Sequence, residues 1–201
     1  MDLNRAMIFA DGENLTYRFQ AMVAAGRTPN AQIQHESDTF VWVPQIVTYS
    51  SWLLTRVSYY TSVVGDDVKL QQLAERLSAI RYDYGAGFGF LNPHIFKKQS
   101  RGAKTKSVDI NLVTDLLRHT YNRSVDEVLV LTGDGDYLPT IHEVMRQGVR
   151  VSVGAFSSGL DIRLRTQTDE FVDLDQMCFE LQQPANDALQ PTRPASGEPG
   201  G

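Results

Sequence analysis

Short apolar runs alternate with longer amphipathic stretches along most of this 201-residue chain. The runs that read as strands are apolar or rich in β-branched and aromatic residues, and turn residues bound them: 6–10, 56–64, 125–133, 149–156, 170–174 and part of 85–96. The stretches that read as helices repeat apolar residues every three or four positions: 13–25, 43–54, 66–80, 108–122 and 137–148. Strands that alternate with helices predict an α/β fold, with helices layered on a mostly parallel central sheet.

Two stretches depart from this alternation. Residues 27–40 are polar and are expected to form an exposed loop or insertion. Residues 182–201 hold four of the eight prolines of the chain and are expected to form a disordered tail. The sequence therefore predicts one folded domain over residues 1–181.

The composition is that of an ordinary globular protein, with 42% hydrophobic and 21% charged residues. No stretch is long and apolar enough to cross a bilayer, and the N-terminus lacks the layout of a secretory signal. A single cysteine, Cys178, excludes an internal disulfide and a zinc site made of several cysteines. We expect a cytoplasmic protein that has no membrane partner.

Positive charge is concentrated in one segment. The net charge of −5 gives no global attraction for nucleic acid, yet residues 97–106 carry basic side chains and no acid: Lys97, Lys98, Arg101, Lys104 and Lys106. Such a segment is either a solvated loop or a contact for phosphates. Its place directly before Asp109 favours the second interpretation.

Carboxylates stand at three places that an α/β fold would bring together. Asp11 follows the first expected strand, Asp134 and Asp136 follow the strand at 125–133, and Asp109 lies near the start of a helix. Ligands of open α/β sheets collect beyond the carboxyl ends of the strands. Clustered carboxylates need a cation to stay ionised, and a set of ligands made only of oxygen suits Mg²⁺ or Mn²⁺.

Each of these residues also has an ordinary structural interpretation. Asp11 could belong to an Asp-Gly turn, Asp109 could be a helix N-cap, and Asp134 with Asp136 could form the turn before a helix. Asp115 follows Asp109 by six residues, roughly 240° around a helix, and is expected to face elsewhere. Glu13 either points to solvent or joins the acidic site.

The motifs together resemble the NYN domain, a member of the PIN-like nuclease superfamily that includes LabA-type proteins. They are Asp11 with Asn14, the stretch from Lys106 to Asp109 with a later Thr-Asp, and TGDGDY at 132–137, and the resemblance covers residues 5–175. Thr132 stands where serine is more usual, and Gly135 where many relatives carry serine or another residue. The resemblance implies a PIN-like α/β/α sandwich and a ribonuclease site dependent on Mg²⁺ or Mn²⁺.

The resemblance also implies roles for individual residues. The catalytic and metal-binding residues would be Asp11, Asp109, Asp134 and Asp136. Asn14 and Thr132 would support them, and Arg101, Lys104 and Lys106 would bind the substrate.

The function expected from these residues is hydrolysis of RNA phosphodiester bonds. Two alternatives remain open, a nonenzymatic RNA-binding or regulatory module with the same fold and a phosphatase of small phosphoesters. Tyr137, Phe88 and Phe90 are candidates for stacking on bases or for core packing, and no histidine is expected to be catalytic. The RNA target, the choice between RNA and DNA, and the oligomeric state, including a homodimer, stay open.

Overall fold

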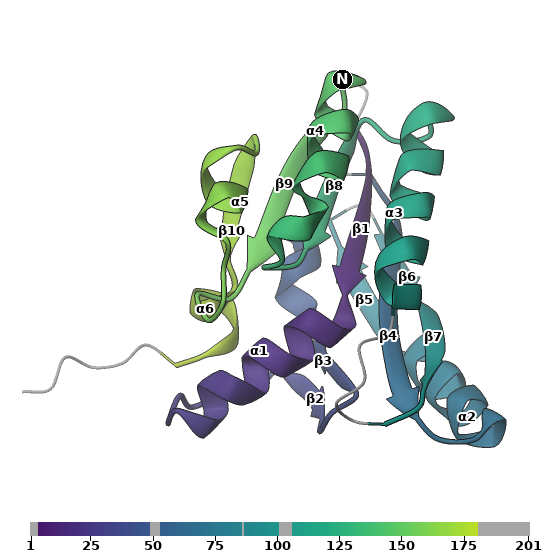
Figure 1. Cartoon of the computed structure of the whole chain (residues 1–201), viewed down its shortest axis with the longest axis vertical. Coiled ribbons are helices and arrows are strands. Elements are labelled where there is room, and N and C mark those ends of the chain that lie inside the picture. Colours follow the sequence, from purple (N-terminus) through teal and green to yellow (C-terminus); the bar gives the residue numbers. More distant parts are fainter. Residues whose placement is uncertain (1–3, 49–52, 86, 101–105, 181–201) are drawn as a thin grey trace, which may run out of the picture.

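The computed structural model describes residues 4–48, 53–85, 87–100 and 106–180. Its centre is a six-stranded sheet in the order β10-β9-β8-β1-β4-β7, and every neighbouring pair in it is parallel (Figure 1). The strands of this sheet are β1 (Arg5–Asp11), β4 (Leu53–Val64), β7 (Asn92–Lys98), β8 (Glu127–Leu131), β9 (Arg150–Ala155) and β10 (Glu170–Asp173).

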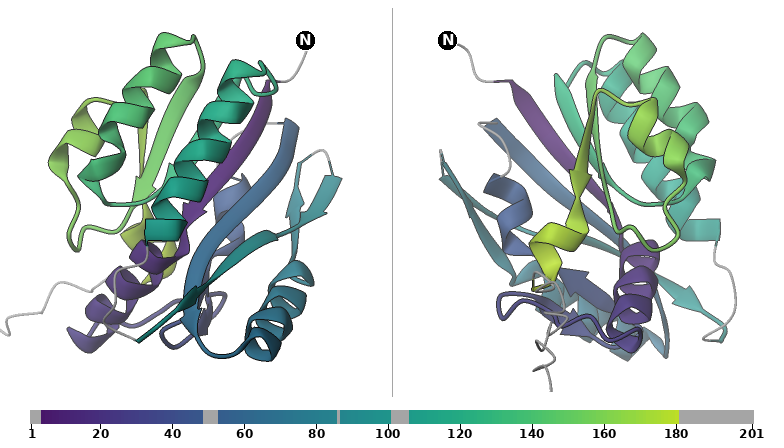
Figure 2. Two further views of the ribbon diagram at one scale, coloured as in Figure 1. Left: turned by 45° about the vertical axis from the view of Figure 1, so that its right-hand side comes forward. Right: turned by 90° about the vertical axis from the view of Figure 1, so that its left-hand side faces the viewer.

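Helices cover both faces of the sheet and make three layers (Figure 2). One face packs against α1 (Gly12–Ala24), α2 (Asp67–Ser78) and α6 (Leu174–Cys178). The other face packs against α3 (Lys106–Tyr121), α4 (Leu138–Arg146) and α5 (Ile162–Thr166). The α/β/α sandwich predicted from the sequence is therefore confirmed.

The sequence of β1 is apolar from Ala6 to Ala10 because both faces of the strand are buried. Side chains alternate along a strand, so Ala6, Ile8 and Ala10 enter the core on the α1 side. Met7 and Phe9 enter the core on the α3 and α4 side. A strand buried on both faces has no polar side, and this is the pattern expected for the centre of a parallel sheet.

Two parts of the sequence interpretation were wrong. Residues 27–40, expected as a loop, contain β2 (Gln34–Glu36), which pairs antiparallel with β3 (Phe40–Trp42). The helix expected over 43–54 is a short 3-10 helix, η1 (Pro44–Thr48), and β4 already begins at Leu53. The apolar spacing there reflects burial of η1 side chains in the core rather than a long helix.

Short elements were also missed or merged. The stretch 85–96 contains β7 and also β6 (Gly87–Phe90), which forms a separate hairpin with β5 (Arg81–Tyr84). Helices α5 and α6 were not expected, because five residues each are too few to show a helical period. The tail predicted for residues 182–201 lies outside the described residues. No helix in the described ranges is long and apolar enough to cross a membrane.

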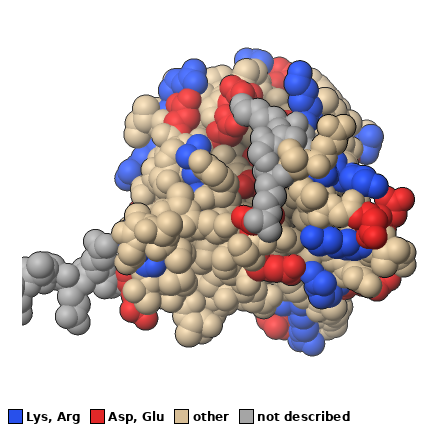
Figure 3. Space-filling view, turned by 60° about the horizontal axis from the view of Figure 1, so that its bottom comes forward, with Lys and Arg blue, Asp and Glu red and all other residues tan. Residues whose placement is uncertain are grey.

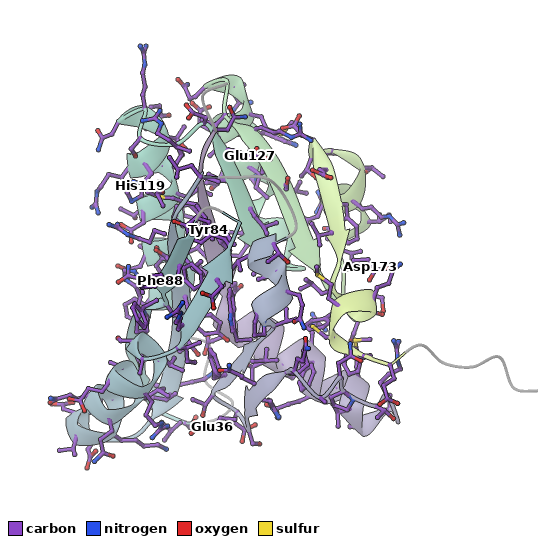
Figure 4. All side chains as sticks on the ribbon, turned by 180° about the vertical axis from the view of Figure 1, so that it is seen from behind. Glu36, Tyr84, Phe88, His119, Glu127 and Asp173 are labelled. Atoms are coloured by element: carbon purple, nitrogen blue, oxygen red, sulfur yellow. The ribbon has the colours of Figure 1, made fainter. Side chains whose placement is uncertain are left out.

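All six strands point the same way, so their carboxyl ends form one edge of the sheet, at the bottom of Figure 1. Glu36 of β2 lies toward this end of the molecule, and Glu127 at the start of β8 lies at the opposite end (Figure 4). The chain moves from β1 to β4 and β7 on one side, and α3 then returns it to β8 on the other side of β1. The β1–β8 boundary is thus the topological switch point, where ligands of open α/β sheets bind.

Candidate functional site

Asp11 ends β1 at the switch point and is only 4% exposed. Its Oδ1 accepts a hydrogen bond from the backbone N–H of Asn14 at 3.1 Å, which makes Asp11 the N-cap of α1. Its Oδ2 accepts one from the Thr132 hydroxyl at 3.2 Å. The pKa of Asp11 is raised to about 7: burial is the main cause, the charges of Asp109 and Glu13 contribute, and the two hydrogen bonds oppose the shift.

Gly12 allows α1 to start this close to the sheet. A Cβ atom at Gly12 would lie 2.3 Å from Cε1 of Tyr59 and 2.8 Å from the carbonyl oxygen of Tyr60. A residue with a side chain would therefore push the helix away from β4. Asp11, which could have been part of an ordinary Asp-Gly turn, is the N-cap of α1 and places a buried carboxylate at the carboxyl edge.

The end of β8 is tied to the start of α1. The backbone N–H of Gly133 donates to Oδ1 of Asn14 at 3.0 Å, and the N–H of Asp134 donates to Oγ1 of Thr132 at 3.2 Å. Thr132 thus accepts from one side and donates to Asp11 on the other. Threonine keeps the hydroxyl that this arrangement needs, so its departure from serine leaves the strand end intact.

Asp134 and Asp136 lie at the same edge with exposed side chains. Asp134 caps a short 3-10 helix, η2 (Gly135–Tyr137), by accepting from the N–H of Asp136 at 2.9 Å. Gly135 lies against the 156–161 loop. A Cβ at position 135 would lie 2.0 Å from Oδ2 of Asp161, so a larger residue would require the Asp161 side chain to move. The sequence departure at Gly135 therefore matches a close contact with the neighbouring loop.

Asp109 reaches the edge from the first turn of α3, which begins at Lys106. The N-cap interpretation of Asp109 is therefore wrong. Its Oδ1 accepts a hydrogen bond from the Tyr137 hydroxyl at 2.9 Å. Partial burial raises the pKa of Asp109; the Tyr137 hydrogen bond opposes the shift, and the charges of Asp134, Glu13 and Asp136 add to it.

Tyr137 lies close to both Asp11 and Asp109, which was not expected from the sequence. Its ring is only 3% exposed, so it cannot stack on a base, and the packing interpretation holds. Burial raises its pKa, and the nearby charges of Asp11 and then Asp109 raise it further. The phenol therefore stays protonated and acts as a hydrogen-bond donor to Asp109. The sequence signal was the tyrosine that closes TGDGDY.

Glu13 joins the site rather than pointing to solvent. Its Oε1 accepts from Nζ of Lys98 at 2.8 Å and from the hydroxyl of Ser62. Lys98 ends β7 and belongs to the basic segment of residues 97–106, whereas its neighbour Lys97 pairs with the exposed Asp67. Lys98 was not among the substrate-binding residues expected from the sequence.

Of the basic candidates expected from the sequence, Lys106 lies among the described residues. It is the first residue of α3 and is exposed, three positions before Asp109. Arg101 and Lys104 lie outside the described residues. Acidic side chains and Lys or Arg side chains both occur on the face that contains the carboxyl edge (Figure 3). Asp115 faces elsewhere, as expected, and accepts a hydrogen bond from the Tyr60 hydroxyl at 3.0 Å.

The donors at the edge are all oxygens, which is the chemistry that a hard divalent cation prefers. The charge of Asp109 raises the pKa of Asp11, and the charges of Asp134, Glu13 and Asp136 raise the pKa of Asp109, so a bound cation would favour the ionised form of both carboxylates. Within the described residues, however, no group of three or more His, Cys, Asp or Glu side chains is arranged to hold a metal ion. The donor chemistry fits Mg²⁺ or Mn²⁺, while Asp134 uses its carboxylate as a cap.

The parallel sheet, its two helical layers and the acidic edge define a PIN-like, nuclease-like α/β protein. The chain belongs to the NYN domain family, whose model matches residues 5–175. A solved structure, that of a protein of unknown function from Vibrio parahaemolyticus, shares the fold with a TM-score of 0.58 at 18% sequence identity. The match covers 90% of this chain and 100% of that one. No curated protein matches the sequence significantly.

Proposed function

We propose that this protein is a ribonuclease that hydrolyses phosphodiester bonds of RNA at the carboxyl edge of its sheet, with Mg²⁺ or Mn²⁺ as cofactor. The observation that carries the proposal is Asp11, a buried carboxylate at the switch point whose pKa is raised to about 7 beside a second perturbed carboxylate, Asp109. Buried carboxylates with strongly shifted pKa values in such a place are characteristic of functional sites. Membership of the NYN family supports a nucleic-acid substrate.

Asp11 and Asp109 would hold the cation, with Asp134 and Asp136 as the further oxygen ligands at this edge. A bound divalent ion would supply positive charge to the scissile phosphate and lower the pKa of a water molecule that attacks phosphorus.

The remaining residues would hold these carboxylates in place. The Asn14 backbone and the Thr132 hydroxyl fix both oxygens of Asp11, and the Tyr137 hydroxyl fixes one oxygen of Asp109. A carboxylate that is already oriented loses less entropy when it binds a ligand. The phosphate backbone of the RNA would be contacted by Arg101, Lys104 and Lys106. Lys106 precedes Asp109 by three residues, which is about one helical turn.

The test is cleavage of an end-labelled RNA pool by the purified protein in Mg²⁺, Mn²⁺ or EDTA. Asp109→Asn and Asp134→Asn remove one candidate ligand each while keeping the shape of the side chain. Asp126→Asn is the matched control, because Asp126 precedes β8 at the opposite end of the sheet, where it pairs with Arg5 at 2.9 Å.

Cleavage that needs the metal, is lost in Asp109→Asn and Asp134→Asn, and persists in Asp126→Asn would support the proposal. Binding of RNA without fragments in either metal would favour a nonenzymatic RNA-binding module. Turnover of a chromogenic phosphomonoester in place of RNA would favour the phosphatase. Equal cleavage by all variants would refute the residue assignments.

A further inference from the structure

A pocket of about 180 Å³ opens beside the acidic edge. Its walls are α1, the tip of the β2–β3 hairpin and the carboxyl end of β4, elements that lie close together in Figure 1. The helix contributes residues at i, i+3, i+4 and i+7, which share one face: Glu13, Thr16, Tyr17 and Gln20. The β2–β3 hairpin, which was expected to be an exposed loop or insertion, is thus one wall of a pocket.

Hydrogen bonds attach the tip of the hairpin to the core domain. Gln20 Nε2 donates to Oδ1 of Asp38 at 3.1 Å, and the N–H of Asp38 donates back to Oε1 of Gln20 at 2.8 Å. On the other side, the Thr61 hydroxyl of β4 donates to the carbonyl oxygen of Thr39 at 3.0 Å. Asp38 itself has a φ of 57°, which closes the turn tightly. The pocket therefore has a defined shape.

One buried hydroxyl in the lining lacks a good partner. Thr16 is 4% exposed, and its Oγ1 makes no hydrogen bond of good geometry with the described residues. The nearby Tyr59 hydroxyl donates to the carbonyl oxygen of Val41 and accepts from the Val41 N–H, and a further hydrogen bond from Thr16 acts to lower the pKa of Tyr59. Buried polar groups without partners are rare, because they cost free energy unless a ligand or water satisfies them. The Thr16 hydroxyl is enclosed by the protein, so its nearest partner is the Tyr59 hydroxyl rather than a ligand.

The pocket is continuous with the acidic site. Glu13 and Lys98 line it, and their ion pair also lies next to the two perturbed carboxylates, since the charge of Glu13 raises the pKa of Asp11 and of Asp109. Lys69 adds a second ammonium group to the lining and donates to the carbonyl oxygen of Val64 at 2.9 Å. A phosphate at the acidic edge would thus have its neighbouring nucleoside beside this pocket.

We infer that this pocket is a subsite for one unpaired nucleoside of the RNA strand, next to the scissile phosphate. The inference rests on the proposed function. The volume is below the roughly 300–1,000 Å³ of pockets for drug-sized ligands, so it suits a single base or ribose rather than a dinucleotide. Proteins read single-stranded RNA by hydrogen bonds to base edges and by aromatic stacking.

The lining offers both kinds of contact. Hydroxyls and an amide line the interior: Gln20, Ser37, Thr39, Thr61 and Ser62. The Tyr17 side chain is 66% exposed at the rim of the pocket, so its ring offers a surface on which a base can stack. The guanidinium group of Arg18 lies 5.3 Å from the centroid of this ring. Together these contacts give the enzyme a nucleotide preference at one position beside the cut.

Two variants test the subsite. Thr39→Val removes a hydroxyl of the pocket lining without changing the volume, and Tyr17→Ala removes the stacking ring. Tyr121→Ala is the matched control for the second, because Tyr121 is also an exposed tyrosine but lies at the end of α3. Thermal unfolding of all variants comes first. Thr39→Val loses one exposed hydrogen bond, from the Thr39 hydroxyl to the carbonyl oxygen of Ser37 at 3.1 Å, and is expected to unfold close to the temperature of the wild type.

The first readout is the binding of the four ribonucleoside 5′-monophosphates in EDTA, followed by protein NMR. We expect one of them to bind best and to bind about tenfold more weakly to each of the two pocket variants. Unchanged binding in both variants, or no binding of any monophosphate to the wild type, would refute the subsite.

The second readout is the nucleotide at each fragment end after cleavage of a random RNA pool. The wild type is expected to show a preference at one flanking position that both pocket variants flatten and Tyr121→Ala keeps. Cleavage with an unchanged preference would overturn the inference and leave the proposed nuclease intact. Pocket-dependent binding of a monophosphate by a protein that cuts no RNA would keep the nucleoside site and reject the nuclease.

Discussion

Replacing Asp11 by asparagine is expected to stabilise the metal-free protein at neutral pH. The change removes the negative charge but keeps the shape of the side chain. The amide oxygen of the new side chain can still accept the hydrogen bond from the Asn14 N–H and so keep the N-cap of α1. The amide N–H₂ can donate to the Thr132 hydroxyl, which lies 3.2 Å from Oδ2 in the wild type. The variant therefore removes a costly charge, at the loss of the one hydrogen bond that the Thr132 hydroxyl donates to Asp11.

The magnitude follows from the pKa of Asp11, which is raised from 3.8 to about 7, mainly by burial. Between these values the folded protein holds the proton and the unfolded chain does not, so the free energy of unfolding falls as the pH rises. A shift of about three units corresponds to about 4 kcal/mol at 1.36 kcal/mol per unit. This loss is complete above pH 7, and Asp11→Asn is expected to avoid up to that amount.

The assay is urea unfolding followed by circular dichroism in EDTA at pH 5.0 and pH 7.5. The wild type is expected to lose more stability between the two values than Asp11→Asn does. Asp126→Asn is the control: hydrogen bonds from Arg5 lower the pKa of Asp126 to about 2, outside this range, so the pH dependence should match the wild type. An Asp11→Asn variant with the pH dependence of the wild type, or one less stable at pH 7.5, would refute the reasoning.

Three further changes have defined outcomes. Tyr137→Phe removes the hydroxyl that donates to Asp109, and we expect the free energy of unfolding to fall by about 1 kcal/mol. The acidic limb of the pH–rate profile is expected to move to higher pH, because the lost hydrogen bond lowers the pKa of Asp109. Gly12→Ala places a Cβ against the Tyr59 ring and is expected to cost about 1–3 kcal/mol in urea unfolding, with no loss expected if α1 can shift freely. Lys98→Met is expected to weaken RNA binding and to reduce the slope of the logarithm of the RNA association constant against the logarithm of the salt concentration by about 0.7. An unchanged slope would show that Lys98 does not contact an RNA phosphate.

The central strands and the main helices could be predicted because their sequence patterns are strong. The run from Ala6 to Ala10 is apolar throughout because both faces of β1 are buried. Parallel strands point their carboxyl ends the same way, so Asp11, Asp134 and Asp136 could be expected at one edge before any contact was known. Asp109 could be expected there too, because the start of a helix that packs on the sheet can face the same edge, and the family resemblance agreed with this expectation.

The rest depended on tertiary contacts that no local pattern contains. The β2–β3 hairpin is held by the pairing of Gln20 with Asp38, residues that are 18 positions apart. Lys98 was one of several lysines in a basic run until β7 placed it 2.8 Å from Glu13. The role of Tyr137 as a donor to Asp109 depends on how α3 packs beside η2, which sequence periodicity does not specify.

The central claim is that the carboxyl edge is a metal-dependent nuclease site, and the most direct measurement is the single-turnover rate of cleavage of a labelled RNA across a range of Mn²⁺ concentrations. The account predicts a rate that rises to saturation with Mn²⁺ in the wild type and a loss of at least a hundredfold, on the order of the effect of losing an essential charged group, in Asp11→Asn and Asp109→Asn. Cleavage that proceeds in EDTA, or that both variants retain at the rate of the wild type, would contradict it.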